Sequence, residues 1–159
     1  MQAIASLEVG QEAPDFKLRG PGGQAVTLSE FRGSRNVVLV FYPLAFSPVC
    51  SHQLPAIEHE ITRFDQLGAT VLGISVDSHY ANTAFAERLR LSFPLLSDFH
   101  RLASAAYGVL IPESGHSGRA IFVVDRRGLV AYKDVSQAIG DPGQIPSNDR
   151  VLAHLASLA

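Results

Sequence analysis

The sequence is poor in cysteine, in net charge and in long apolar runs, and each shortage narrows the class of protein. Its 159 residues include one cysteine, Cys50, which cannot form an intramolecular disulfide. This favours a reducing, cytoplasmic location. The formal net charge of −2 gives no reason to expect nucleic acid or an acidic membrane as a partner. The longest apolar run, NVVLVFYPLAF, contains a proline and is shorter than the ~18 residues of a membrane span. The start, MQAIASLEVG, lacks the basic residues and apolar run of a secretory signal.

The composition is that of an ordinary globular domain. Apolar residues make up 47% of the chain and charged residues 18%, and the length is sufficient for one hydrophobic core. No linker, repeat or low-complexity stretch divides the sequence. We therefore expect a single domain spanning residues 1–159.

Several segments have the patterns of β-strands. APDFKLRGPGGQAVTLSEF alternates around a turn at Gly20–Gly23 and predicts an N-terminal hairpin. Two continuous apolar runs, NVVLVFY and GATVLGISVD, predict strands buried on both faces. FPLLSD predicts a short strand, and RAIFVVDRRGLVAYKDV predicts two strands joined by a turn at residues 125–128.

Helices are predicted between these strands. The longest, from about residue 48 to residue 67, carries Leu54, Ile57, Ile61 and Phe64 at steps of three and four. Further helices are expected after Ser78 as cap, in RLASAAYGV ending at Gly108, and in SNDRVLAHLASLA with Ser147 or Asn148 as cap. Alternating strands and helices require parallel pairing, and the hairpins add antiparallel strands. The predicted fold class is α/β, with a mixed central sheet flanked by helices on both faces.

Cys50 follows a helix-start signal. Ser47 and Pro48 suit an N-cap and the first helical position, which would make Cys50 the third helical residue. The free amide N–H groups of a helix N-terminus stabilise a thiolate, the reactive form of a thiol. Because a helix dipole supplies only ~0.3–1 kcal/mol at an exposed terminus, a nearby cation is also needed. Spacing alone does not select one from the 13 lysines and arginines.

A structural cysteine is the alternative interpretation. Cys50 extends the apolar stripe of the predicted helix backwards, and a free cysteine often packs in a core as a small hydrophobe. The position between a strand and a helix favours chemistry instead, because α/β folds place ligands at the carboxyl ends of parallel strands.

The segment PLAFSPVC, residues 43–50, resembles the active-site motif of the peroxiredoxin family, Pro-x-x-x-Thr/Ser-x-x-Cys. Further segments resemble the family's in the same order, namely VGQEAPDFKL, LGISVDS, FPLLSDFHRLASAAYGV and GRAIFVVDRRG. The form of the motif is most similar to the one-cysteine, bacterial AhpE-like branch. The resemblance implies a thioredoxin-like fold with the peroxiredoxin N-terminal hairpin, and a thiol peroxidase activity.

The resemblance also implies a role for each residue of the site. Cys50 corresponds to the cysteine that attacks the peroxide O–O bond, and Ser47 to the residue whose hydroxyl binds the peroxide and the thiolate. Pro43 corresponds to the proline that shields the site from water, and Arg119 to the arginine that stabilises the thiolate and the reacting oxygens. Gln53 stands where relatives often have glutamate, and a neutral amide can orient Arg119 without offsetting its charge.

The absence of a second cysteine shapes the implied cycle. One peroxiredoxin branch keeps a second cysteine at the position of Pro55. Here the Cys50 sulfenic acid must be reduced by an external thiol: a low-molecular-weight thiol, a glutaredoxin-like protein or a thioredoxin. The implied substrates are hydrogen peroxide, organic hydroperoxides and peroxynitrite. A homodimer or higher homo-oligomer is expected, with exposed aromatics such as Phe46 at its interface.

Other motifs carry less weight. The six histidines are scattered without acidic or cysteine partners at metal-site spacing, so no metal or other cofactor is expected. GHSGR, residues 115–119, lacks the final glycine of the hydrolase motif Gly-x-Ser-x-Gly. The alternative function is a thioredoxin-fold binding or chaperone-like module. Contact between Arg119 and Cys50 would favour the peroxidase, and a cysteine packed on Leu54 without a nearby cation would favour the module.

Overall fold

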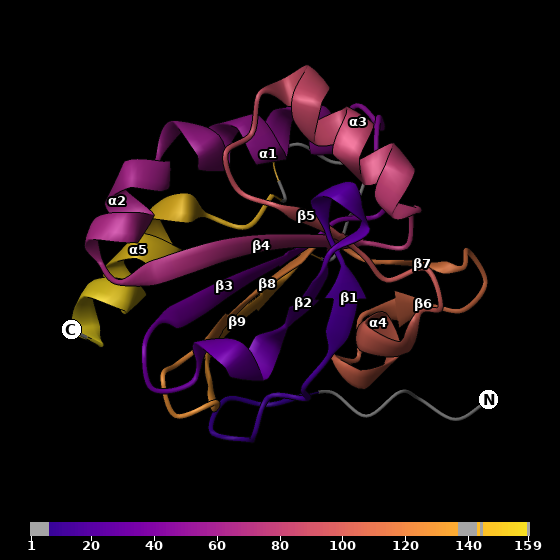
Figure 1. Ribbon diagram of the computed structural model, residues 1–159. Coiled ribbons are helices and arrows are strands. Elements are labelled where there is room, and N and C mark those ends of the chain that lie inside the picture. Colours follow the sequence, from indigo (N-terminus) through magenta and orange to yellow (C-terminus); the bar gives the residue numbers. More distant parts are fainter. Residues whose placement is uncertain (1–6, 137–142, 144, 159) are drawn as a thin grey trace.

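A seven-stranded mixed sheet forms the centre of the computed structural model, which describes residues 7–136, 143 and 145–158 (Figure 1). Its strand order is β2-β1-β5-β4-β3-β8-β9. The strands are β1 (Lys17–Arg19), β2 (Ala25–Thr27), β3 (Asn36–Phe41), β4 (Ala69–Ser75), β5 (Leu95–Ser97), β8 (Ala120–Val124) and β9 (Val130–Val135). β3, β4 and β5 run parallel, whereas β1 and β8 pair antiparallel with β5 and β3. The predicted N-terminal hairpin and the predicted mixed sheet are confirmed.

The sheet separates two apolar clusters. Every residue of β3 is buried, as the continuous apolar run predicts. Because successive side chains of a strand point to opposite faces, Val38 and Val40 enter one cluster, and Val37 and Leu39 enter the other. The strand that delivers the chain to Cys50 is therefore fixed from both sides.

Helices cover both faces (Figure 1). On one face lie α1 (Cys50–His59), α2 (Ile61–Gln66), α3 (His79–Leu89) and α5 (Asn148–Ser157). The other face is covered by α4 (Leu102–Ala106) and by the part of the N-terminal segment that includes the 3-10 turn η2 (Leu28–Phe31), whereas the 3-10 turn η1 (Pro21–Gly23) lies against α3. Among the described residues, no helix is both long and apolar enough to cross a membrane.

The prediction of one continuous helix over residues 48–67 is wrong. The chain leaves helical geometry at Glu60 (φ −103°, ψ 9°), which separates α1 from α2. The Glu60 N–H donates to the carbonyl of Ile57, three residues back, so the last turn of α1 is tightened. Ile57 and Phe64, on either side of the break, still enter the same core cluster, so the apolar spacing continues across it.

Other local predictions are confirmed. The hydroxyls of Ser78 and Ser147 accept from the backbone N–H groups of Ala81 and Arg150 and cap α3 and α5. Gly108, just past α4, has a positive φ of 71°, a conformation that glycine adopts readily. The sequence did not indicate the short hairpin of β6 (Leu110–Ile111) and β7 (His116–Ser117), since strands of two residues carry no alternation.

Candidate active site

A loop connects the end of β3 to the start of α1 and carries the motif found in the sequence. β3 ends at Phe41 and α1 begins at Cys50, so the cysteine lies just beyond the carboxyl end of a central strand. Pro43 is buried at the start of the loop, and Cys50 is 0% exposed. The thiol therefore occupies an enclosed site at the carboxyl ends of the central parallel strands.

Ser47 does not cap α1, which corrects the prediction from the sequence. The Ser47 hydroxyl donates to the carbonyl of Leu44 at 2.8 Å, and no side chain caps the helix. The physical reason is that the hydroxyl is engaged within the loop by the Leu44 carbonyl, while Pro48 and Val49 form a turn before α1. The Ser47 carbonyl accepts from the Ser51 N–H at 3.0 Å. Cys50 is consequently the first residue of α1 instead of the third, and it remains at the helix N-terminus.

The antiparallel pairing of β3 with β8 places Arg119 beside Cys50. Phe41 pairs with Ala120, so Arg119 lies next to the beginning of the cysteine loop. Its Nη1 donates to the Sγ of Cys50 at 3.2 Å, although the two residues are 69 positions apart in sequence. The arginine is only 2% exposed, which keeps its charge within a region of low effective dielectric constant.

Gln53 joins the same arrangement from α1. It is 1% exposed, and its Oε1 accepts from Nη1 of Arg119 at 2.6 Å. One guanidinium nitrogen therefore bridges the sulfur of Cys50 and the amide of Gln53. Because glutamine is neutral, it orients the arginine without adding a negative charge next to the thiol.

This geometry suits chemistry by a thiolate. A guanidinium always carries its charge and offers donors in a fixed planar arrangement, so it stabilises a thiolate and negative charge on nearby oxygens. Cys50 also packs in the core cluster that contains Leu54, as the structural alternative requires. The contact with Arg119 is the feature that distinguishes the two interpretations, and it favours a reactive cysteine.

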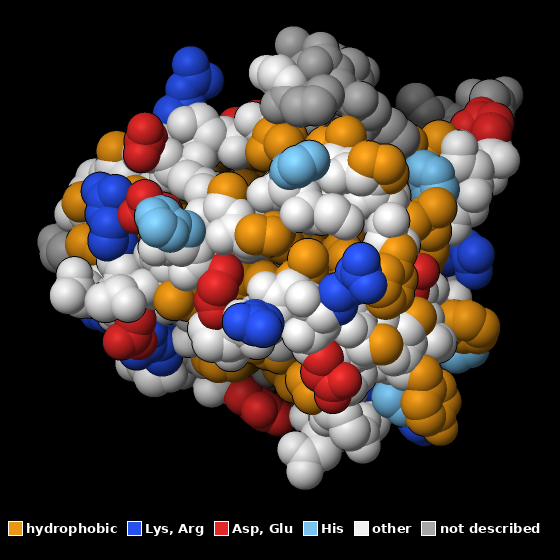
Figure 2. All heavy atoms as spheres, turned by 90° about the horizontal axis from the view of Figure 1, so that it is seen from above, with side chains coloured by type: hydrophobic (Ala, Val, Ile, Leu, Met, Phe, Trp, Pro, Cys, Tyr) orange, Lys and Arg blue, Asp and Glu red, His pale blue; other side chains and the backbone are white. Residues whose placement is uncertain are grey.

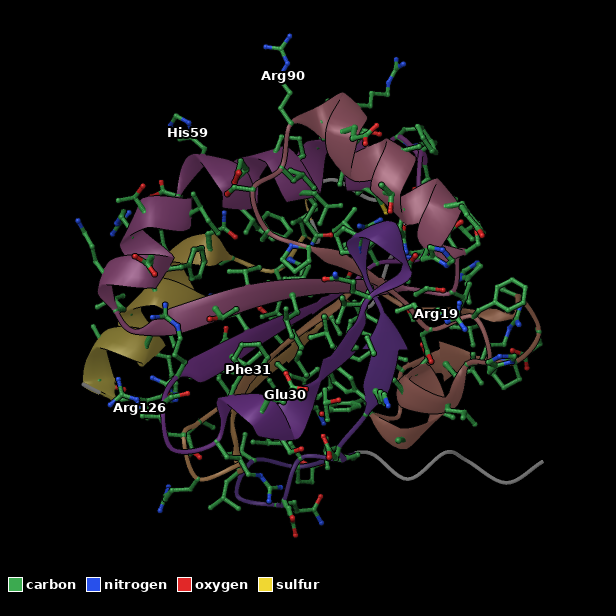
Figure 3. The ribbon with its side chains drawn as sticks, viewed as in Figure 1. Arg19, Glu30, Phe31, His59, Arg90 and Arg126 are labelled. Carbon is green, nitrogen blue, oxygen red and sulfur yellow. The ribbon has the colours of Figure 1, made fainter. Side chains whose placement is uncertain are left out.

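The other sequence motifs contribute no second reactive site. Ser117 of the GHSGR segment is 0% exposed, and its hydroxyl donates to the carbonyl of Tyr42 at 3.2 Å. His59 points out from the end of α1 into solvent (Figure 3). Within the part of the chain that the structure describes, no group of three or more histidine, cysteine, aspartate and glutamate residues could hold a metal ion.

Comparison with known proteins agrees with this geometry. Residues 9–133 match the model of the AhpC/TSA family. The chain is 40% identical over 141 residues to alkyl hydroperoxide reductase E of Mycobacterium tuberculosis, covering 87% of this chain and 90% of that protein. It is 38% identical over 140 residues to a putative peroxiredoxin of Synechocystis, covering 82% and 70%. The solved structure of peroxidoxin BcpB from Mycobacterium tuberculosis superposes with a TM-score of 0.85 at 29% identity, covering 96% of this chain and 99% of that one.

These likenesses confirm the resemblance to the AhpE-like peroxiredoxins and the thioredoxin-like α/β fold. The contact between Arg119 and Cys50 places a permanent cation against the only thiol of the chain, an arrangement that favours the thiolate form. The chain belongs to the AhpC/TSA family and is a thiol peroxidase of the peroxiredoxin type.

Proposed function

We propose that Cys50 reduces peroxides through a sulfenic acid and that an external thiol completes the cycle. The observation that carries this proposal is the buried contact between Nη1 of Arg119 and Sγ of Cys50, at 3.2 Å. Cys50 is the single cysteine of the chain, so no internal disulfide forms during the cycle.

In the first step, the Cys50 thiolate attacks one oxygen of the peroxide. An S–O bond forms and the O–O bond breaks, so the sulfur is oxidised by two electrons to sulfenic acid. The departing oxygen takes the bonding electrons and leaves as hydroxide, as an alkoxide or, from peroxynitrite, as nitrite. The proton that the thiol released on ionising converts hydroxide to water and an alkoxide to an alcohol. Negative charge spreads over the oxygens as the O–O bond breaks, and the fixed guanidinium of Arg119 lowers the barrier because it stabilises that charge.

The surrounding residues support this step. Gln53 holds the guanidinium in place through its 2.6 Å bond to Nη1. Pro43 is buried beside the site and keeps water away without offering a competing donor. We assign the Ser47 hydroxyl to the peroxide because Ser47 lies three residues before Cys50 in the same loop; the hydroxyl would exchange its bond to Leu44 for one to the substrate.

In the second half of the cycle, an external thiol attacks the sulfenic sulfur. A mixed disulfide forms and water leaves; a second thiol then attacks this disulfide, releasing an oxidised disulfide product and restoring the Cys50 thiol. The reductant is a low-molecular-weight thiol, a glutaredoxin-like protein or a thioredoxin. A second peroxide that arrives before the reductant converts the sulfenic acid to sulfinic acid.

The substrates are hydrogen peroxide, organic hydroperoxides and peroxynitrite, and the location is the cytoplasm. The name of the mycobacterial relative, alkyl hydroperoxide reductase E, supports the second of these substrates. The enclosed site also favours small peroxides, because the whole Cys50 residue is 0% exposed.

A second copy of this chain is the partner that the surface favours. Leu44, Phe46, Tyr80, Phe99 and Leu102 are large hydrophobic residues that are 41–77% exposed. Tyr80, Phe99 and Leu102 line one surface cavity of about 470 Å³, and Phe46 packs against Phe85 of α3. Figure 2 shows hydrophobic side chains gathered with histidines along one edge of this side of the molecule. Exposed hydrophobic residues that share one surface region, as Tyr80, Phe99 and Leu102 do, are typical of a protein interface.

Peroxide consumption during repeated turnover tests the proposed cycle. Reduced protein is mixed with hydrogen peroxide or an organic hydroperoxide and with each class of thiol reductant in turn. We expect consumption that needs both Cys50 and one of the reductants, and none for Cys50→Ser. If the Cys50→Ser variant consumes peroxide as fast as the unmodified protein, the proposed cycle is wrong.

A further inference from the structure

A chain of hydrogen bonds ties the loop before Cys50 to β4 and α3. The Tyr42 hydroxyl donates to Oδ1 of Asn82 at 2.6 Å, and Nδ2 of Asn82 donates to the Ser75 hydroxyl at 3.0 Å. The Ser75 hydroxyl donates to Oδ2 of Asp77 at 2.7 Å. From the loop itself, the Ala45 N–H donates to the same Oδ2 of Asp77 at 2.8 Å. The carboxylate of Asp77 is therefore the common acceptor at the end of the chain.

Burial fixes which group donates and which accepts in each of these hydrogen bonds. Tyr42, Ser75 and Asn82 are each 0% exposed, so water does not compete for their bonds. Burial raises the pKa of Tyr42 above its usual range, so its hydroxyl keeps its proton and donates. The same Nδ2 of Asn82 also donates to the carbonyl of Leu96, which holds its amide in one orientation. In each hydrogen bond of the chain from Tyr42 to Asp77, the donor therefore points toward Asp77. Connected hydrogen bonds strengthen one another in a region of low dielectric constant.

The two residues held by these bonds, Tyr42 and Ala45, lie on either side of Pro43 and Leu44 at the start of the loop that leads to Cys50. Tyr42 precedes Pro43, and Ala45 follows Leu44. The next residue, Phe46, has a positive φ of 66°, is 51% exposed and packs on Phe85. The hydrogen bond from the Ala45 N–H to Asp77 therefore holds the backbone of the loop to a charged side chain, next to the exposed Phe46.

The two halves of the proposed cycle make opposite demands on this loop. Peroxide is small, and its reduction benefits from a closed loop that keeps the donors in place. An external thiol is bulkier, and it must approach the sulfur of a residue that is 0% exposed in the closed state. Reduction of the sulfenic acid therefore requires the loop to open.

We infer that Asp77 is a positioning residue that holds the loop Pro43–Ser47 closed over Cys50. Release of its bond to the Ala45 N–H gives the reductant access to the sulfur. The inference about access rests on the proposed function, whereas the closed loop itself does not. A hydrogen bond to an ionised carboxylate is stronger than a neutral one, so a single residue is able to set this balance.

The experiment compares Asp77→Ala with Asp77→Asn and with Asp15→Ala as a matched control. Asp15 also accepts from a backbone N–H, that of Ser29 in η2 at 2.9 Å, but it lies away from the cysteine loop. In single-turnover reactions we expect Asp77→Ala to slow sulfenic acid formation, and to speed its reduction by a bulky thiol, by about tenfold each. Asp77→Asn keeps an oxygen that accepts from the Ala45 N–H but loses the charge, so both rates should change in the same directions as in Asp77→Ala and by a smaller factor.

A measurement on the reduced protein tests the closed loop without any peroxide. Because Cys50 is the only cysteine, alkylation reports on it alone. We expect the rate of alkylation by a bulky maleimide, relative to that by iodoacetamide, to rise about tenfold in Asp77→Ala and to stay unchanged in Asp15→Ala. The variant Ser75→Ala removes one donor to Asp77 and should give a smaller rise in this ratio. It replaces Asp77→Ala in the experiment if that variant does not fold.

The outcomes separate this inference from the proposed function. An unchanged alkylation ratio in both Asp77→Ala and Ser75→Ala, or an equal rise in Asp15→Ala, overturns the role of Asp77 even if the peroxidase cycle operates. Two reaction steps that slow together also overturn it, because a merely structural loss does not accelerate one step. Unmodified protein that forms no sulfenic acid would contradict the proposed function, while the alkylation ratio would still decide whether Asp77 closes the loop.

Discussion

Replacing Gln53 by glutamate tests how the charge of Arg119 is used. The change keeps the size of the side chain and adds a negative charge beside Nη1, where Oε1 of Gln53 lies at 2.6 Å. Glutamate can still orient the guanidinium, but it competes with the thiolate of Cys50 for the same positive charge. We expect the peroxide reaction to slow because the guanidinium then stabilises less of the negative charge on the sulfur and on the reacting oxygens.

The structure sets the size of this effect. Nη1 lies 3.2 Å from the sulfur and 2.6 Å from Oε1, so the two acceptor atoms are within about 6 Å of each other. Two negative charges about 6 Å apart repel by about 3 kcal/mol at an effective dielectric constant of about 20. At ~1.4 kcal/mol for each factor of ten, the expected loss of rate at neutral pH is about 100-fold.

Stopped-flow measurement of sulfenic acid formation across a pH series is the assay. The rate of Gln53→Glu relative to that of the unmodified protein measures the effect of the added charge. Gln53→Met is the neutral control: it removes the anchor of Arg119 without adding charge, so its loss of rate should be smaller than that of Gln53→Glu. A Gln53→Glu variant as fast as the unmodified protein at neutral pH would refute this reasoning.

Three further predictions concern single groups. Arg119→Ala should slow sulfenic acid formation by about 10²–10³-fold in stopped flow, as expected for loss of one preorganised donor; a change under about threefold would contradict its role. Ser47→Ala should slow the same step by about tenfold, and Ser47→Thr, which keeps the hydroxyl, should not. Burial raises the pKa of Tyr42 and Tyr107 from their usual 10.0, so the folded protein holds protons that the unfolded chain releases. The stabilisation that these two tyrosines contribute should therefore be fully present below about pH 10 and be lost above it, so the free energy of unfolding measured by urea titration should fall between pH 10 and pH 12; a flat profile over that range would contradict the burial argument.

The sequence predicted the sheet well because its signals are local. The apolar run of β3, the turn of the N-terminal hairpin and the caps Ser78 and Ser147 each depend on neighbouring residues alone. The helix break at Glu60 was missed, since the apolar spacing continues unchanged across it. The cap assigned to Ser47 was wrong because serine suits both a cap and a turn, and the Pro48 turn left its hydroxyl facing the carbonyl of Leu44.

The contact of Arg119 with Cys50 came from the family resemblance and not from the residues themselves. Nothing in the spacing selects Arg119 among the other cations, because the contact arises from the antiparallel pairing of Phe41 with Ala120. The role of Asp77 was missed for the same reason. Its link to Ala45 spans 32 residues and depends on two strand ends meeting at one edge of the sheet.

The central claim is that Cys50 becomes a sulfenic acid when it reduces a peroxide, and a single-turnover experiment tests it most directly. Reduced protein is mixed with one equivalent of hydrogen peroxide without any thiol, and a sulfenate-specific reagent is added before mass spectrometry of the peptide that contains Cys50. We predict that each chain consumes one peroxide molecule and that the label falls on Cys50. Unlabelled Cys50 together with undiminished peroxide would contradict the account.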